Sequence, residues 1–199
     1  MKPLPRALLI PAPGRPDPAH PRGGIALVEP DSTIPALRQA LAAGATTVAL
    51  AGCRTGADLQ RMATLLSVAE AEEDRPEGST AILALTDGIL PGPASPQSLA
   101  GKSARLIGVA WDQGTLTRVL GTSSAFTEDG DWTSAFAAAR AATLLTAAMA
   151  GVPAYDSPWS AGEGDFARSC KRSRDDGFFG RIAADAAQIL IIEALYARA

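Results

Sequence analysis

The sequence predicts an α/β fold with a parallel sheet, and three observations support this prediction. Short apolar runs and alanine-rich helical stretches alternate along the chain. The spacing between the runs leaves room for helical crossovers, which parallel strands require. The runs are continuously apolar, as is typical of strands covered on both faces. Two architectures fit this order of elements, a (β/α) barrel and a doubly wound open sheet.

Seven apolar runs are predicted to be strands. They cover residues 7–11, 25–28, 47–51, 81–85, 105–111 and 152–155, with a seventh strand inside 178–183. Six or seven strands are slightly few for a closed barrel of eight, so the pattern by itself leaves both architectures open. Residues 88–101 carry Pro91, Pro93 and Pro96, which allow at most a short helix there.

Helices are predicted between these strands from their start and stop signals. The predicted ranges are 35–43, 57–73, 132–150, 165–175 and 185–198. Pro35 lies in the first turn of the first helix. Thr55 and Asp58 have the spacing of a capping box at the start of the second helix. Gly151 follows the end of the third helix, and Asp185 is placed as the N-cap of the last one.

Composition limits the classes of protein to which the chain can belong. Its 199 residues favour a single domain over residues 1–199, and 47% apolar residues suffice for a core. A charged fraction of 20% with a net charge of −3 argues against a disordered chain and against a nucleic-acid-binding surface. No apolar stretch has the length of a membrane span, and the first residues do not resemble a secretory signal. We therefore expect a cytoplasmic protein.

Few residues are available for histidine- or cysteine-based chemistry. Cys53 and Cys170 are the only cysteines, which is too few for a disulfide framework. His20 is the only histidine, and this excludes metal sites with several histidines. A serine or cysteine nucleophile would need His20 as its base, but His20 lies in the proline-rich segment 14–21, a poor support for catalysis. A catalytic triad is therefore not expected.

An acidic residue follows five of the predicted strands. These residues are Glu29, Asp87, Asp112, Asp156 and Asp185. The carboxyl ends of parallel strands form the active-site edge of α/β folds, so carboxylates gathered there could bind Mg²⁺. The alternative is structural, because aspartate is also favoured in turns and at helix N-caps. Both interpretations stay open for each residue.

The loop 52–56 (GCRTG) joins a predicted strand to the start of a helix. Its backbone amides and Arg54 could bind a phosphate, although a pair of glycines is also typical of a simple tight turn. Cys53 is interpreted as a small buried residue. Residues 101–103 (GKS) do not form a P-loop, because Pro96 stands where a glycine is needed and a strand follows. No dinucleotide-binding fingerprint follows any predicted strand.

Several further segments form a recognisable series along the chain. They are 6–11 (RALLIP), 50–59 (LAGCRTGADL), 105–111 (RLIGVAW), 128–134 (EDGDWTS), 150–156 (AGVPAYD) and 176–181 (DGFFGR), together with Gln188. In order and spacing this series resembles the citrate lyase beta-subunit-like proteins of the HpcH/HpaI aldolase family. The resemblance covers most of the chain from residue 47 onward, plus a short N-terminal piece. It implies a (β/α)₈ barrel that is shortened or distorted, because the segment carrying the family's second strand is missing.

The resemblance also implies a chemistry and a set of site residues. Family members cleave or form carbon–carbon bonds in hydroxy acids or CoA thioesters, usually with Mg²⁺. The resemblance places Asp87 at a metal-binding glutamate and Thr115 at the second metal carboxylate, with Asp112 nearby as a substitute. We assign substrate contacts to Gly52, Arg54 and Asp156. The expected ligand is a small carboxylic acid or an acyl-CoA.

The sequence departs from the family at several of these positions. Thr115 supplies no charge, the family's clamping arginine falls near Leu27, and residues 51–52 (AG) replace its Pro-Lys. These losses favour a non-catalytic relative that binds a ligand or a protein through the barrel mouth. A divergent carbon–carbon lyase and an unrelated doubly wound binding domain are the alternatives. The missing strand would leave an unpaired sheet edge, so we also expect a homo-oligomer.

Overall fold

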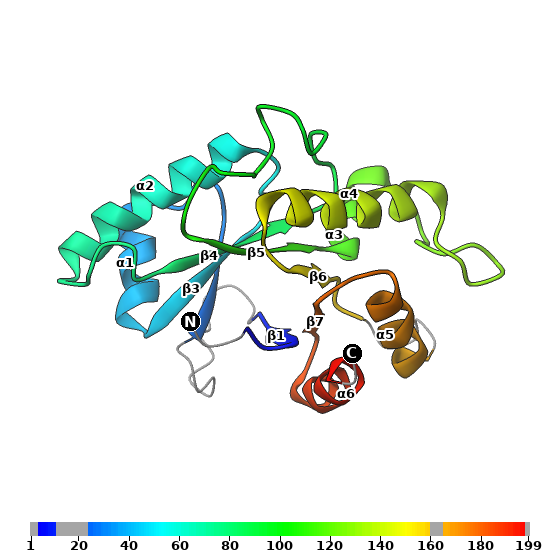
Figure 1. Cartoon of the computed structure of the whole chain (residues 1–199). Coiled ribbons are helices and arrows are strands. Elements are labelled where there is room, and N and C mark those ends of the chain that lie inside the picture. The colour runs from blue at the N-terminus through cyan, green and yellow to red at the C-terminus, as the bar shows by residue number, and fades with distance from the viewer. Residues whose placement is uncertain (1–3, 11–23, 160–164, 198–199) are drawn as a thin grey trace.

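The computed structural model describes residues 4–10, 24–159 and 165–197. Within these residues, seven parallel strands form one sheet in the order β1-β7-β6-β5-β4-β3-β2 (Figure 1). The strands are β1 (Ala7–Leu9), β2 (Gly24–Val28), β3 (Ala45–Leu50), β4 (Ala81–Thr86), β5 (Leu106–Trp111), β6 (Ala154–Asp156) and β7 (Gly180–Ala183). Strands that neighbour one another in the sheet are consecutive along the chain, except that β1 pairs with β7.

The sheet curls into a nearly closed barrel with one open seam between β1 and β2. In the described part of the chain, β1 pairs only with β7 and β2 pairs only with β3. Each strand contributes one buried side chain to a common interior core. These side chains are Leu8, Ile25, Ala49, Leu83, Ala110, Tyr155 and Ile182. A doubly wound sheet would reverse its strand order and keep its edge strands apart, so that alternative is wrong and the predicted shortened barrel is confirmed.

Six helices cover the outside of this barrel in the described residues. They are α1 (Ile34–Ala42), α2 (Gly56–Glu72), α3 (Gln113–Leu120), α4 (Ser134–Ala150), α5 (Phe166–Asp175) and α6 (Ala186–Tyr196). Five of them lie close to the predicted ranges, and α3 was not predicted because Gly114, Thr115 and Thr117 are weak helix formers. It forms because Asp112 caps its first turn and Leu116 packs into the core. None of the helices described is long and apolar enough to cross a bilayer.

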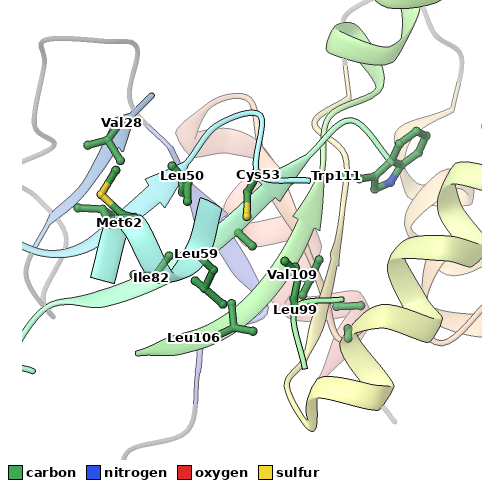
Figure 2. Close-up of a cluster of buried hydrophobic side chains, with 14 of the residues drawn as sticks. Val28, Leu50, Cys53, Leu59, Met62, Ile82, Leu99, Leu106, Val109 and Trp111 are labelled. Carbon is green, nitrogen blue, oxygen red and sulfur yellow. The ribbon is translucent and has the colours of Figure 1, made fainter. Parts of the chain in front are cut away.

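A second core lies between the strands and the helices. Along each strand, the residues that do not face the barrel interior point outward to this layer. On α2, Leu59, Met62 and Leu66 are three and four positions apart and are all buried against the sheet. Figure 2 shows Leu59 and Met62 packed beside Leu50 and Ile82, which come from β3 and β4. The helix layer therefore holds the strands in place from outside.

The predicted capping box sets the start of α2. Thr55 Oγ1 accepts a hydrogen bond from the backbone N–H of Asp58 at 3.4 Å, and Asp58 Oδ2 accepts one from the backbone N–H of Thr55 at 2.8 Å. The two bonds satisfy N–H groups that a helix start leaves unpaired. They also fix the loop that joins β3 to α2, which carries Arg54.

A buried ion pair fixes the other end of α2. Glu70 is fully buried, and Arg105 Nη1 and Nη2 donate to its two oxygens at 2.9 and 2.8 Å. The backbone N–H groups of Gly78 and Thr80 donate to the same carboxylate at 2.8 and 2.7 Å. Burial would raise the pKa of Glu70, but the hydrogen bonds from Arg105 and from Thr80 lower this pKa to about 2. The pair joins α2, the segment before β4 and the start of β5.

We expect Glu70→Gln to lower the free energy of unfolding by about 3–5 kcal/mol, because it leaves Arg105 without its buried partner. Denaturation in urea measures the change. Glu72→Gln is the matched control, since Glu72 forms an exposed ion pair with Arg38, and it should change stability by less than about 0.5 kcal/mol. Equal effects of the two variants would contradict a structural role for Glu70.

Candidate functional site at the barrel mouth

The carboxyl ends of β2 to β5 form the mouth of the barrel, which is where barrels of this type carry their sites. Side chains alternate along each strand, and Leu83 and Ala110 face the interior. Asp87 and Asp112 follow them at even spacing and therefore also face inward. A pocket of about 250 Å³ lies there, with a polar wall formed by Glu29, Gly52, Asp87, Asp112, Thr115 and Arg118.

The floor of the mouth is apolar. A second pocket, of about 210 Å³, shares Leu27, Leu85 and Asp112 with the first. Ile10 and Ile182, which belong to the β1 and β7 side of the barrel, line it further. The mouth therefore combines charged groups at its rim with an apolar interior.

Asp87 is the most deeply buried charged group of the mouth, being only 1% exposed. Its Oδ2 accepts a hydrogen bond from Arg54 Nε at 3.0 Å and another from Arg54 Nη2, and its Oδ1 accepts one from the backbone N–H of Ile89 at 3.0 Å. The hydrogen bond and the charge of Asp87 raise the pKa of Arg54. Arg54 is itself held in place, because its backbone N–H donates to Asp58 Oδ2 at 3.1 Å. Two of the predicted site residues are thus brought together as an ion pair.

Asp112 has a structural task at the same mouth. It is the N-cap of α3, where its Oδ1 accepts a hydrogen bond from the backbone N–H of Gly114 at 2.9 Å. The hydroxyl of Thr115 donates to Asp112 Oδ2 at 2.6 Å, and Arg118 Nη2 donates to that hydroxyl oxygen at 2.7 Å. These contacts place the guanidinium of Arg118 at the rim, close to the carboxylate of Asp112, whose two oxygens already accept hydrogen bonds.

The structure places Asp156 outside the mouth. Tyr155 faces the barrel interior, so its neighbour Asp156 points outward into the layer between the strands and the helices. Asp156 is 1% exposed, and Arg140 Nη1 donates to both its oxygens at 2.7 Å. Trp111 Nε1 also donates to Oδ1 at 2.6 Å, and Arg181 Nη2 lies 3.4 Å from Oδ2. Substrate binding by Asp156 stays a prediction, while its contacts give it a structural role.

The other predicted candidates occupy different positions. Gly52 lines the mouth pocket. Cys53 is fully buried, and burial raises the pKa of its thiol to about 12, in line with the interpretation of a small core residue. Asp185 caps α6 by accepting a hydrogen bond from the backbone N–H of Gln188 at 2.9 Å. His20 lies outside the described residues.

The donor set of the mouth does not fit a magnesium site in this arrangement. Mg²⁺ prefers several anionic oxygens in octahedral geometry. Asp87 is already neutralised by Arg54, and both oxygens of Asp112 accept hydrogen bonds within α3. Among the described residues, no three histidine, cysteine, aspartate or glutamate side chains form a group that could hold a metal ion.

Sequence reasoning missed three arginines that organise this region. Arg118 reaches the mouth only because α3 forms, and the sequence of α3 carries no clear helix signal. Arg140 and Arg181 come from α4 and β7, and both lie at least 16 residues from Asp156 in sequence. The one available signal was that each interrupts an apolar stretch, where a charge requires a partner.

Solved structures of several proteins are similar to this chain. RipC from Yersinia pestis superposes with a TM-score of 0.65 at 22% identity, over 86% of this chain and 75% of RipC. The citrate lyase beta subunit from Mycobacterium tuberculosis, complexed with oxaloacetate and magnesium, gives 0.63 at 21% identity, over 86% and 72%. CitE from the same organism, in complex with magnesium, acetoacetate and coenzyme A, gives 0.63 at 21% identity, over 86% and 60%.

The chain has the fold of these proteins. Citrate lyase beta subunits are also the proteins that its sequence segments resemble, so the two comparisons agree. No protein-family model matches the sequence, and no curated protein matches it significantly.

We expect Asp156→Asn to lower the free energy of unfolding by about 3–5 kcal/mol, because it leaves buried Arg140 and Arg181 without their shared counter-charge. Thermal or urea denaturation measures the loss. Asp175→Asn is the control, since Asp175 is exposed and its ion pair among the described residues is with neighbouring Arg174, and it should cost less than about 0.5 kcal/mol.

The loss of stability caused by Asp156→Asn is predicted to depend on pH. Burial would raise the pKa of Asp156, but the charges of Arg181 and Arg140 lower it from 3.8 to about 2. The contribution of Asp156 is therefore fully present above about pH 4 and is lost as the pH falls toward 2. The difference in stability between the wild-type protein and Asp156→Asn should shrink over this range. A difference that stays constant down to pH 2 would contradict the ionised pairing.

Proposed function

We propose that this chain is a divergent relative of citrate lyase beta subunits that binds a small carboxylic acid or an acyl-CoA at the barrel mouth, with carbon–carbon lyase activity impaired or lost. The shared fold, the resembling segments and the placement of the mouth pocket support a ligand of this class. The alternative within the proposal is a relative that uses the mouth only to bind a ligand or a protein. A cytoplasmic location and a single domain over residues 1–199 stay predictions.

The Arg54–Asp87 ion pair is the observation that carries this proposal. Cleaving a carbon–carbon bond next to a carbonyl produces an enolate, and catalysis requires a strong electrophile to stabilise its charge. The resemblance assigns that task to a metal held at the position of Asp87. Here Asp87 is buried and paired with the Arg54 guanidinium, so the edge of the mouth offers a cation for binding an acid, without the metal ligands for the reaction.

Binding and turnover measured side by side test this function. Oxaloacetate and acetoacetate, each alone and with acetyl-CoA, are titrated into the protein by calorimetry. Formation of a carbon–carbon bond between the enolate of acetyl-CoA and the keto carbon of the acid is followed in the mixtures that contain both. We expect binding of at least one acid and no turnover above the uncatalysed rate. Turnover that disappears in Asp87→Asn would establish an active lyase instead. If none of the acids binds, the proposed ligand class is wrong.

We also propose that the protein associates with a second copy beside the open seam. In the described residues, the edge of β1 toward β2 has no strand partner, and such edges attract further pairing. α6 lies next to β1, and its Glu193 accepts hydrogen bonds from the backbone N–H groups of Arg6 and Ala7, both at 3.0 Å. The outward residues of α6 are apolar, and Leu190 is 75% exposed. A helix that is apolar on its outer face as well is typical of a buried helix.

We expect the wild-type protein to sediment as a dimer or larger at micromolar concentration and Leu190→Glu to sediment as a monomer, because a charge on this face opposes its burial. Analytical ultracentrifugation measures the mass. Leu145→Glu is the matched control, since Leu145 on α4 is 58% exposed and lies on another helix, and it should keep the wild-type mass. A monomeric wild-type protein would rule out this association.

A further inference from the structure

Arg54 keeps hydrogen-bonding capacity that its partner does not use. A guanidinium has five N–H donors, and the bonds to Asp87 engage Nε and Nη2. Nη1 makes no hydrogen bond to any residue in the described ranges. The side chain of Arg54 is 47% exposed, whereas that of Asp87 is 1% exposed. The two members of the pair therefore differ in exposure: the carboxylate of Asp87 is buried, and the guanidinium of Arg54 faces solvent.

The position of this cation is fixed from both ends. Its backbone N–H is tied to Asp58 in the capping box of α2, and its guanidinium is tied to Asp87 at the end of β4. A ligand would not have to order a free side chain, so less conformational entropy is lost on binding. Gly52, two residues earlier in the same loop, and Asp87 both line the pocket, so the guanidinium that contacts Asp87 lies at the edge of that pocket.

The guanidinium and a divalent cation exclude each other at Asp87. A carboxylate neutralised by Arg54 has little attraction left for Mg²⁺, and a dication placed against it would be repelled by the guanidinium. Mg²⁺ would therefore have to displace Arg54 before it could bind.

We infer that Arg54 takes the place of a metal ion at the edge of this pocket: it binds the carboxylate of a small acid directly, through its outward N–H groups, and no divalent cation takes part. The inference rests on the proposed function, because it names how the proposed ligand is held. It assigns Arg54 as the residue on which the specificity for an anionic ligand depends, with Asp87 as its positioning residue.

Ligand binding with and without metal is the first test. Acetoacetate and oxaloacetate are titrated into the wild-type protein in EDTA and, separately, in MgCl₂, and we expect equal affinity in both. Arg54→Met should weaken binding about tenfold or more, which is the effect of losing a charge-assisted hydrogen bond. Arg61→Met removes the same charge from an exposed position on α2 and should bind like the wild-type protein.

The outcomes separate this inference from the proposed function. Binding that requires MgCl₂ would overturn the role of Arg54 and leave the ligand class intact. Unchanged affinity in Arg54→Met would do the same. If neither acid binds in either buffer, the proposed function itself fails.

A stability measurement gives a readout that needs no ligand. In Arg54→Met, Asp87 loses its counter-charge, so MgCl₂ should raise the melting temperature of this variant but not that of the wild-type protein. Magnesium stabilising the two proteins equally would contradict mutual exclusion. Should Arg54→Met fail to fold, the variant Arg54→Met/Asp87→Asn removes both charges together. It should fold, lose acid binding and show no response to MgCl₂, and acid binding retained in it would overturn the inference.

Discussion

The second half of the barrel depends on the buried pairing of Asp156 with two arginines. Asp156 ends β6, a strand of only three residues that offers few backbone hydrogen bonds of its own. Its carboxylate meets Arg140 from α4 and Arg181 from β7, and Asp176 after α5 pairs with Arg140 at 2.7 Å. Two positive and two negative charges thus balance within one layer. A carboxylate buried in this layer without a partner would not stay ionised. The positions of β6, β7, α4 and the end of α5 therefore depend on one another.

The alternation that buries this cluster also builds the mouth. At the carboxyl end of β6, the acidic residue falls on the outward side of the strand and meets arginines from helices and strands. At the ends of β4 and β5, the acidic residues fall on the inward side and meet the pocket. A shift of one position along a strand therefore decides whether the aspartate side chain faces the helix layer or the mouth pocket.

Much of the fold could be predicted from the sequence, because its signals are local. The capping residues Thr55 and Asp185 and the apolar runs fix helices and strands without knowledge of the rest of the chain. The inward placement of Asp87 and the outward placement of Asp156 also follow from alternation, once the interior residues of each strand are known. The partners of these carboxylates could not be predicted, because Arg54 and Arg140 approach them from other elements, 33 and 16 residues away. Thr115 and Arg118 join the site only through α3, which tertiary packing stabilises against weak propensity.

The open seam and the altered charge of the mouth have different consequences. Ile10 and Leu27 stand on the two sides of the seam and line the apolar pocket, so a missing strand changes the shape of that floor. Asp87, Asp112 and Arg118 follow β4 and β5, which pair on both sides, whereas Glu29 follows β2 at the seam. Loss of a strand therefore leaves the charges that follow β4 and β5 in place. The Arg54–Asp87 pair, in contrast, acts on the charge of the mouth directly, because the guanidinium neutralises a carboxylate that lines the pocket. For the proposed function, the Arg54–Asp87 pair therefore matters more than the incomplete barrel.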